Sequence, residues 1–200
     1  MVNQSSIKAV NSSLLEEGYR KPLYDSYCFE NIPSTVEKIL TSQSKQITLP
    51  YDTLPNDLAK YKNIVVILVD AMGWNLIKKK INTHPVLKEI NKNGIISKLT
   101  AIFPSTTANC VTCMNTGLTS LNSGVIGWSY FVPELDALVR PLPYIYIEPF
   151  QNKGKLKSDD FDFILNKGNF YERLHEYDID SHLVILDKYA KSTYNQKISD

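Results

Sequence analysis

The chain has 200 residues, of which 43% are apolar and 22% are charged, and 22 Lys and Arg against 21 Asp and Glu give a formal net charge of +1. This composition is typical of a globular protein and excludes a disulfide-dense scaffold or a disordered tail. The basic residues are scattered and form no continuous cationic stripe, so we expect no nucleic-acid duplex as a partner.

The cysteines and the start of the chain predict a cytoplasmic protein. Three cysteines, Cys28, Cys110 and Cys113, are an odd number, and the opening Met-Val-Asn-Gln-Ser-Ser lacks the basic start and apolar core of a secretory signal. The longest apolar run, Ile64 to Val69, is far shorter than the about 20 residues that cross a bilayer, so we expect no membrane span. The single Cys-x-x-Cys pair has no second pair beside it, and we favour core packing over zinc binding for it.

Residues 1–60 form a polar lead-in with little regular structure. We expect a short helix near the start and another after Pro33, where Ser34 is placed to cap Thr35–Leu40. Residues 61–200 form a predicted βα core.

The core begins with a predicted strand buried on both faces. Ile64 to Val69 are all branched or apolar and end abruptly in Asp70, as in the strands of a parallel sheet. Apolar residues at helical spacing then follow from Trp74 to Ile90, and Asn93-Gly94 predicts the helix end. Residues 95–103 are predicted to form a second strand.

Hydroxyl side chains follow this second strand. Pro104 breaks it, and Ser105-Thr106-Thr107 precede a predicted helix over Ala108 to Asn115 that stops at Gly117. Thr106 and Thr107 are therefore expected at a helix N-terminus, which carries about half a positive charge and unpaired N–H groups and suits a phosphoryl group. The competing interpretation is an ordinary helix cap.

The rest of the chain contributes weaker predictions. We expect an irregular excursion over 130–142, a solvated loop over 153–160, a short helix over 170–176, and a buried strand over 182–186 that ends in Asp187. No terminating helix is predicted within residues 192–200, so we expect an incomplete domain.

Asp70 lies where open α/β sheets place their ligand sites, at the carboxyl end of a strand. Its carboxylate could bind a metal ion, accept a phosphoryl group or shape a turn. An alcohol such as Thr107 needs a base or a metal to act as a nucleophile, and no histidine lies nearby in sequence. A shared metal ion would link Thr107 to Asp70.

Taken in order, these motifs resemble a known family. Ile64–Asp70 with Gly73, then Phe103-Pro104-Ser105-Thr106-Thr107, then Thr116-Gly117-Leu118 and Ser123-Gly124-Val125 resemble the type I phosphodiesterase/nucleotide pyrophosphatase family of the alkaline phosphatase superfamily. In that family the nucleophilic threonine is the third residue after a proline and precedes a Thr-Gly pair by nine positions. Both counts lead to Thr107, with Thr106 as second choice.

The resemblance implies a fold and a chemistry. The fold would be α/β and alkaline-phosphatase-like, a largely parallel central sheet with helices on both faces, and residues 1–200 would be the N-terminal part of one catalytic domain. The activity would be that of a metal-dependent phosphodiesterase or nucleotide pyrophosphatase that forms a covalent phospho-threonine intermediate on Thr107. Asp70 and Thr107 would bind one of two divalent metal ions, zinc by the family's habit.

The remaining metal ligands are expected beyond residue 200, so the 200-residue chain alone is expected to be inactive. The substrate would be a small phosphodiester or nucleotide, contacted by Asn109 and by the aromatic face of Trp128. Here the sequence departs from the family, because Asn109-Cys110 stands where members often carry Pro-Asn. The alternatives are a phosphomonoesterase, sulfatase or phosphotransferase of the same superfamily, or a non-catalytic binding module with a degenerate site.

Overall fold

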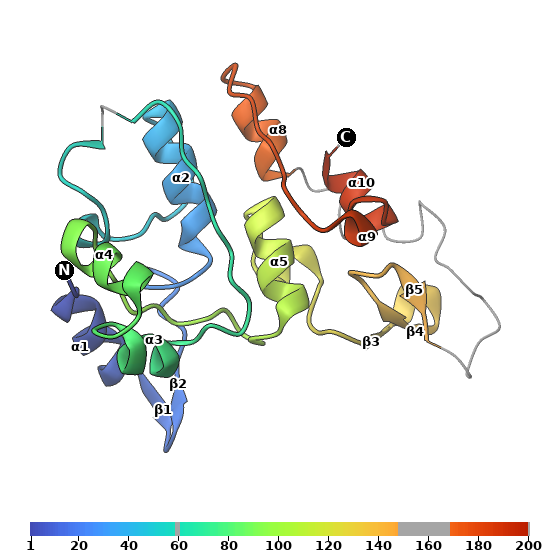
Figure 1. Cartoon of the computed structure of the whole chain (residues 1–200). Helices are drawn as coiled ribbons and strands as arrows, with labels where there is room; N and C mark the ends of the chain where they lie inside the picture. The colour runs from blue at the N-terminus through green and yellow to red at the C-terminus, as the bar shows by residue number, and fades with distance from the viewer. Residues whose placement is uncertain (59–60, 148–168, 200) are drawn as a thin grey trace. The chain divides into compact units, whose positions relative to one another are not determined.

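The computed structural model describes residues 1–58, 61–147 and 169–199, which form two compact units, Met1–Ala101 and Ile102–Asp200 (Figure 1). Each unit is considered by itself. The loop predicted over 153–160 lies outside the described residues. None of the helices in the described ranges is long and apolar enough to cross a membrane.

The lead-in is more regular than its polar sequence predicts. It contains helix α1 (Gln4–Ser12), the antiparallel hairpin of β1 (Leu14–Glu16) and β2 (Tyr19–Arg20), helix α2 (Asn31–Thr41) and the short helix η1 (Tyr51–Thr53). The side chain of Asn3 caps α1 by accepting a hydrogen bond from the Ser6 backbone N–H at 3.0 Å. Both helices predicted in this region are therefore present.

Helix α2 begins earlier than predicted, at Asn31 rather than after Ser34. Asn31 Nδ2 donates to the carbonyls of Tyr24 and Ser26 at 2.9 and 2.8 Å, which fixes the start of the helix. Pro33 is tolerated because N–H groups of a first helical turn have no intrahelical acceptor. The Ser34 hydroxyl donates to the carbonyls of Asn31 and Ile47 and does not cap the helix.

The prediction of a buried parallel strand over Ile64–Val69 is wrong for this structure. The run is extended but belongs to no strand, and its ribbon carries no arrow in Figure 1. The side chains of Val65 and Ile67 are 83% and 78% exposed. The apolar sequence favours burial, but no described segment pairs with the run or covers its two faces. A largely parallel central sheet is therefore absent from the described residues.

The segment predicted as the second strand, 95–103, instead makes two isolated parallel bridges with the lead-in. Ile96 pairs with Val2, and Thr100 pairs with Cys28. The Thr100 backbone N–H donates to the Tyr27 carbonyl at 2.9 Å, and the Phe29 N–H donates to the Thr100 carbonyl at the same distance. The polar lead-in thus supplies the hydrogen-bonded neighbours of segment 95–103. The irregular sequence of the lead-in does not predict this pairing.

The helical pattern between these two segments is divided into α3 (Trp74–Lys80) and α4 (Pro85–Asn93). Pro85 is the first residue of α4. Proline loses no helical hydrogen bond there, because a backbone N–H at this position has no acceptor within the helix. Gly94 ends α4, as the Asn93-Gly94 signal predicts.

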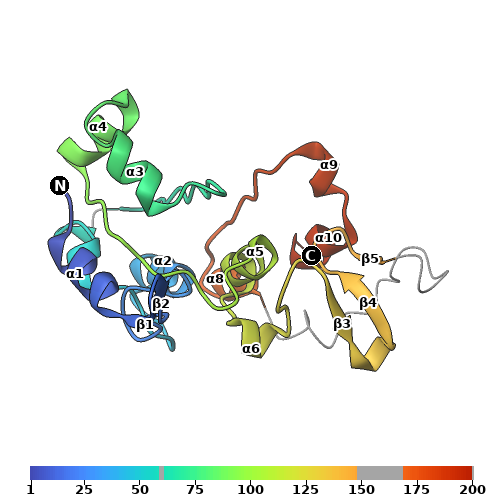
Figure 2. The ribbon, with the colours of Figure 1, turned by 90° about the horizontal axis from the view of Figure 1, so that it is seen from below.

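The second unit begins with helix α5 (Thr107–Thr116) and the short helix α6 (Ser120–Ser123). Gly117 ends α5 in the left-handed region with φ 70°, as the sequence predicts. Helix α5 packs against α6 and against helix α8 (Phe170–His175), and the three lie together in Figure 2.

A three-stranded antiparallel sheet replaces the irregular excursion predicted over 130–142. Its strands are β3 (Tyr130–Val132), β4 (Ala137–Arg140) and β5 (Ile145–Tyr146), in the order β3-β4-β5. The short helix η3 (Pro133–Leu135) and Asp136 at φ 46° form the connection between β3 and β4. The prolines that suggested irregularity lie in the connections between strands, where no ladder hydrogen bond is lost.

The end of the chain also differs from its prediction. The predicted strand over 182–186 is an exposed extended segment, with Val184 92% exposed, and Asp187 starts helix α9 (Asp187–Ala190). A terminating helix, α10 (Thr193–Ser199), follows where none was predicted. Its Tyr194 and Ile198 are buried in one core with α5 and the sheet, a core made of Ala108, Val125, Val132, Ala137, Val139, Tyr144, Tyr194 and Ile198.

The observed fold is therefore mixed α/β, with small antiparallel sheets. The helix predicted over 170–176 is confirmed as α8, and its start is fixed by a reciprocal cap. Asn169 accepts from the Glu172 N–H at 2.7 Å, and the Glu172 carboxylate accepts from the Asn169 N–H at 3.1 Å.

Candidate functional site

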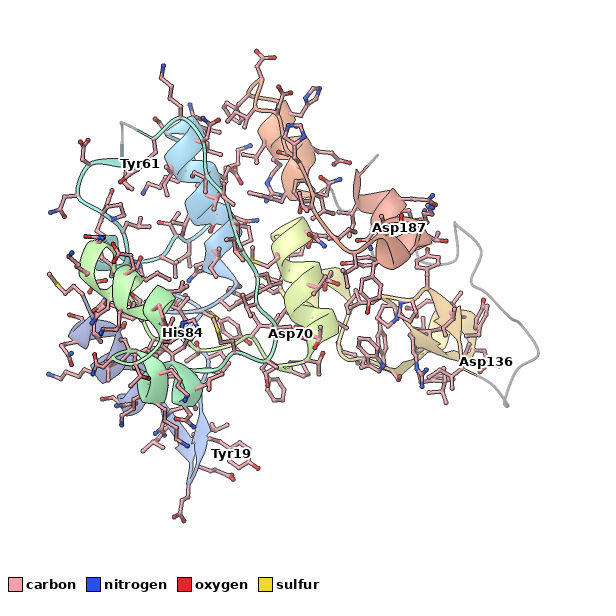
Figure 3. The ribbon with its side chains drawn as sticks, in the orientation of Figure 1. Tyr19, Tyr61, Asp70, His84, Asp136 and Asp187 are labelled. Carbon is pink, nitrogen blue, oxygen red and sulfur yellow. The ribbon has the colours of Figure 1, made fainter. Side chains whose placement is uncertain are left out.

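Asp70 lies in the turn that connects the extended run 64–69 to α3, and its side chain is labelled in Figure 3. The carboxylate is exposed, and its Oδ1 accepts a hydrogen bond from the Ala71 backbone N–H at 2.9 Å. Ala71 adopts φ 60°, a left-handed conformation that is costly for a residue with a Cβ atom. The turn is sharp, and it leaves the Asp70 carboxylate accessible to a cation.

The other predicted site residues lie at the N-terminus of α5. Thr106 is the cap, with φ −101° and ψ 155°, and Thr107 is the first helical residue. The Thr106 hydroxyl oxygen accepts from the Asn109 backbone N–H at 3.5 Å and donates to Asn109 Oδ1 at 2.9 Å. The hydroxyl of Thr106 is thus committed to the first turn of the helix.

Asn109 connects this helix start to the neighbouring helix α6. Its side chain is only 2% exposed, and Nδ2 donates to the Ser120 hydroxyl oxygen at 2.9 Å. Ser120 is itself buried at the first position of α6. The chain Thr106–Asn109–Ser120 therefore fixes the orientation of the α5 N-terminus, because each polar group in it has a partner inside the protein.

Thr107 is half-buried and is followed by the fully buried Ala108. Because α5 has ten residues and starts here, its first N–H groups and its dipole favour a negative charge near Thr107. An oxyanion or a phosphoryl oxygen is the kind of group that such a helix start can stabilise.

Trp128, predicted as an aromatic substrate contact, lies in the bend before β3. Its side chain is 49% exposed, and Ile126 and Phe131 nearby in sequence are 49% and 52% exposed. In the same region Arg140 Nε donates to the Ser129 hydroxyl oxygen at 3.3 Å. Trp128 is therefore accessible to a ligand.

Asp70 belongs to the first compact unit, and Thr106, Thr107, Asn109 and Trp128 belong to the second. The second unit thus brings Thr106, Thr107 and Asn109 together on one helix start. Across the described ranges, no group of three or more His, Cys, Asp or Glu side chains is placed to hold a metal ion. The carboxylate of Asp70 and the hydroxyl of Thr107 are each oxygen donors of the kind that suits a divalent cation.

The cysteines take no part in this candidate site. Cys113 is fully buried inside α5, and Cys28 is fully buried in the first unit, where burial raises the pKa of its thiol. None of the three cysteines is in a disulfide bond. The full burial of Cys113 agrees with the core packing predicted for it.

The comparison with protein families gives a match over part of the chain. Residues 64–141 match the type I phosphodiesterase / nucleotide pyrophosphatase family. The matched segment is a partial, N-terminal segment of that family's domain and includes Asp70, Thr107, Asn109 and Trp128. Searches of curated proteins and of solved structures gave no match. The resemblance inferred from the motifs is confirmed.

Sequence reasoning missed Ser120, the buried partner of Asn109. The Thr119-Ser120 pair predicts only a local helix cap, and indeed Thr119 caps α6 by accepting from the Asn122 N–H at 3.2 Å. The contact between Ser120 and Asn109 depends on how two helices pack, and no local pattern encodes it.

Proposed function

We propose that this chain contributes the nucleophile and one metal ligand of a metal-dependent phosphodiesterase or nucleotide pyrophosphatase. The family match supports phosphoester hydrolysis in general. The observation that supports the finer proposal is the α5 N-terminus, where Thr107 begins a ten-residue helix whose first turn is fixed by Thr106, Asn109 and Ser120.

Thr107 would act as the nucleophile. Its hydroxyl oxygen would form a bond to phosphorus while the bond from phosphorus to the leaving alcohol breaks, giving a phospho-threonine that water then hydrolyses to a phosphate monoester. The N–H groups at the start of α5 would stabilise the negative charge on the phosphoryl oxygens. Thr106 would orient the helix start rather than react.

Asp70 and Thr107 would hold one of two divalent metal ions, with zinc as the first choice. A bound divalent ion lowers the pKa of a coordinated hydroxyl, as it lowers that of water from 15.7 to about 7. Asp70 would supply a negative oxygen ligand, and its exposed position in the turn before α3 leaves it accessible for this role. Trp128 would offer an aromatic face to the substrate.

The test is hydrolysis of bis-nitrophenyl phosphate and of mono-nitrophenyl phosphate by the complete gene product with zinc. We expect preferential turnover of the diester, and Asp70→Asn should lower both the zinc content and the rate while the circular dichroism spectrum stays unchanged. Preferential turnover of the monoester would favour a phosphomonoesterase. Unchanged zinc content and rate in Asp70→Asn would refute the metal-binding role.

A second candidate is a non-catalytic binding module with a degenerate site. The observation that favours it is that no three potential metal ligands gather among the residues that the structure describes. This alternative predicts that the complete gene product binds a diester without hydrolysing it, which calorimetry in parallel with the rate assay distinguishes.

A further inference from the structure

The helix that begins at Thr107 makes a buried polar contact with its neighbour α6. Asn109 lies in the first turn of α5 and is 2% exposed, and Ser120 is the first residue of α6 and is 7% exposed. Asn109 Nδ2 donates to the Ser120 hydroxyl oxygen at 2.9 Å. Because a buried amide or hydroxyl is costly without a partner, this contact favours one position of α6 against the first turn of α5.

Both ends of the Asn109 carboxamide have partners within the second unit. Oδ1 accepts from the Thr106 hydroxyl at 2.9 Å, and Nδ2 donates to Ser120. These directions are consistent with the chemistry of a carboxamide, whose oxygen accepts and whose nitrogen donates. Since Asn109 is almost fully buried, a substrate oxygen has little access to the remaining hydrogen of Nδ2. The side chain therefore suits the support of the helix start better than contact with a substrate.

The connection between the two helices returns from the end of α5 to its start. Thr116 ends the helix, and Asn109 lies about 10 Å back along the axis, at about 1.5 Å per residue. The chain leaves the helix at Gly117 and reaches Asn109 again at Ser120, and Figure 2 shows α6 beside α5. Helix α6 is thus joined to α5 covalently at one end of α5 and by a buried hydrogen bond at the other.

We propose that Ser120 and Asn109 are positioning residues for Thr107, on which they act by fixing the first turn of α5 against α6. This inference rests on the proposed function, in which Thr107 is the nucleophile. Thr107 lies between Thr106 and Asn109, so a shift of this turn also displaces the Thr107 hydroxyl. A displacement of about 1 Å can lower a rate about a hundredfold, because the reacting atoms leave the geometry of attack.

The test compares Ser120→Ala with Ser123→Ala in the complete gene product, with bis-nitrophenyl phosphate and zinc. Ser123 is the matched control, because it is a buried serine of the same helix whose hydroxyl bonds to the Ser120 carbonyl at 3.5 Å and to the Val125 N–H at 3.2 Å. Ser120→Ala should lower kcat about tenfold and change KM by less than about twofold. Ser123→Ala should leave kcat nearly unchanged, and Ser120→Thr, which keeps the hydroxyl, should retain most of it.

A double-mutant cycle tests whether the two positioning residues act as one unit. Asn109→Leu breaks the same contact from the side of α5, and it takes the place of Ser120→Ala if that variant does not fold. Because both substitutions remove one shared interaction, the double variant should have nearly the kcat of Asn109→Leu alone. Thr106→Ala leaves the contact between Asn109 and Ser120 in place and should retain more of kcat than either substitution.

Amide hydrogen exchange distinguishes this inference from the proposed function, because it requires no turnover. The Asn109 N–H donates to the Thr106 hydroxyl oxygen, and the Cys110 N–H donates to the Thr106 carbonyl. Both amides should exchange about tenfold faster in Ser120→Ala than in the wild type, and at the wild-type rate in Ser123→Ala. If the wild type hydrolyses neither nitrophenyl ester, the proposed function fails, and the exchange rates alone decide whether Ser120 fixes the helix start.

An unchanged kcat in Ser120→Ala of an active enzyme would overturn the inference. An equal loss of kcat in Ser120→Ala and Ser123→Ala would also overturn it, because it would show a general loss of structure. A raised KM with an unchanged kcat would instead assign Asn109 to substrate binding. Unchanged exchange of the Asn109 and Cys110 amides in Ser120→Ala would show that the contact does not hold the first turn of α5.

Discussion

Thr106 and Thr107 are neighbours with the same side chain, but the structure gives them different environments. The Thr106 hydroxyl is engaged with both the backbone and the side chain of Asn109, whereas Thr107 begins the helix proper. An oxygen that already caps a helix would have to break these bonds to attack phosphorus. The cap therefore argues against Thr106 as the nucleophile.

We therefore predict that, in the complete gene product, Thr107→Ala affects mainly the catalytic rate and Thr106→Ala affects mainly the stability. Thr107→Ala should lower the diesterase rate by at least about a thousandfold, because it removes the nucleophile, with little change in stability. Thr106→Ala should retain a substantial fraction of the rate and cost about 1 kcal/mol of unfolding free energy through the lost cap. The rate of bis-nitrophenyl phosphate hydrolysis measures the effect on catalysis, and urea denaturation measures the effect on stability. If Thr106→Ala lowered the rate more than Thr107→Ala, Thr106 would be the nucleophile instead.

Glu30 is a residue whose charge the fold disfavours. Burial raises the pKa of its carboxyl group to about 7, and the nearby charge of Asp25 contributes to the rise. Within the described part of the chain its Oε2 atom is buried and has no hydrogen-bond partner. The folded state binds this proton more tightly than the unfolded state, so protonation of Glu30 stabilises the fold. This contribution to the free energy of unfolding is fully present below about pH 4.5 and is lost as the pH rises through about 7.

Glu30→Gln should consequently raise the unfolding free energy at pH 8 and reduce its dependence on pH between 5 and 8. The gain should be about 1 kcal/mol or less, because the side chain is half-exposed and solvent screens its charge. Urea denaturation at pH 5 and pH 8 measures it. Asp25→Asn should give a smaller gain of the same sign. An equal stability of wild type and Glu30→Gln at both pH values would contradict this account.

At the scale of elements, α10 contributes one polar and one apolar side chain, Tyr194 and Ile198, to the core of the second unit. The hydroxyls of Tyr194 and Thr112 lie 3.0 Å apart and are fully buried, and Ile198 one turn later is 2% exposed in the same core. Burial is also the main reason that the pKa of Tyr194 is raised to about 12. The hydroxyl therefore stays protonated at neutral pH and can hydrogen bond with Thr112.

Ile198→Ala should lower the free energy of unfolding by about 2–5 kcal/mol, because it removes buried methyl groups and leaves a cavity. Gln196→Ala changes an exposed residue of the same helix and should be close to neutral. Urea denaturation followed by circular dichroism measures both. If the two variants were equally stable, α10 would contribute little to the core of the second unit.

Local signals in the sequence predict the helix ends well and the strands poorly. The stops at Gly94 and Gly117 and the helix start near Thr106 and Thr107 depend on residues a few positions apart, and all three are present in the structure. A strand instead requires a partner that is distant in sequence. The apolar patterns of 64–69 and 182–186 indicate which segments would be buried in a sheet, but they do not supply the neighbours, and both segments are exposed.

The same reasoning applies to the candidate site. The motifs identify the segment that matches the family, because they depend on order and spacing along the chain. The assignment of Thr107 as the nucleophile remains a prediction. The contact between Asn109 and Ser120 depends on packing between elements, and only the structure reveals it. Sequence patterns therefore identify the family segment better than the contacts that orient its side chains.

For the whole molecule, the number of metal ligands determines the last prediction. A catalytic zinc needs about three protein ligands to keep its geometry and an open position, and two zinc ions need more. In the proposed site Asp70 and Thr107 would supply two ligands, and no group of three potential ligands occurs among the residues with a described structure. Without a tightly held cation the hydroxyl of Thr107 stays neutral and unreactive.

The 200-residue chain, purified alone and supplied with zinc, should therefore show no diesterase activity above the background of zinc in buffer. Its zinc content after dialysis should be low and should be the same in Asp70→Asn, because one carboxylate alone does not retain the ion. The complete gene product assayed in parallel is the positive control. The prediction would be wrong if the 200-residue chain showed robust zinc-dependent turnover that Thr107→Ala abolished, because these residues would then contain a full set of metal ligands. The first side chains to substitute in that case would be His175, His182 and Asp187.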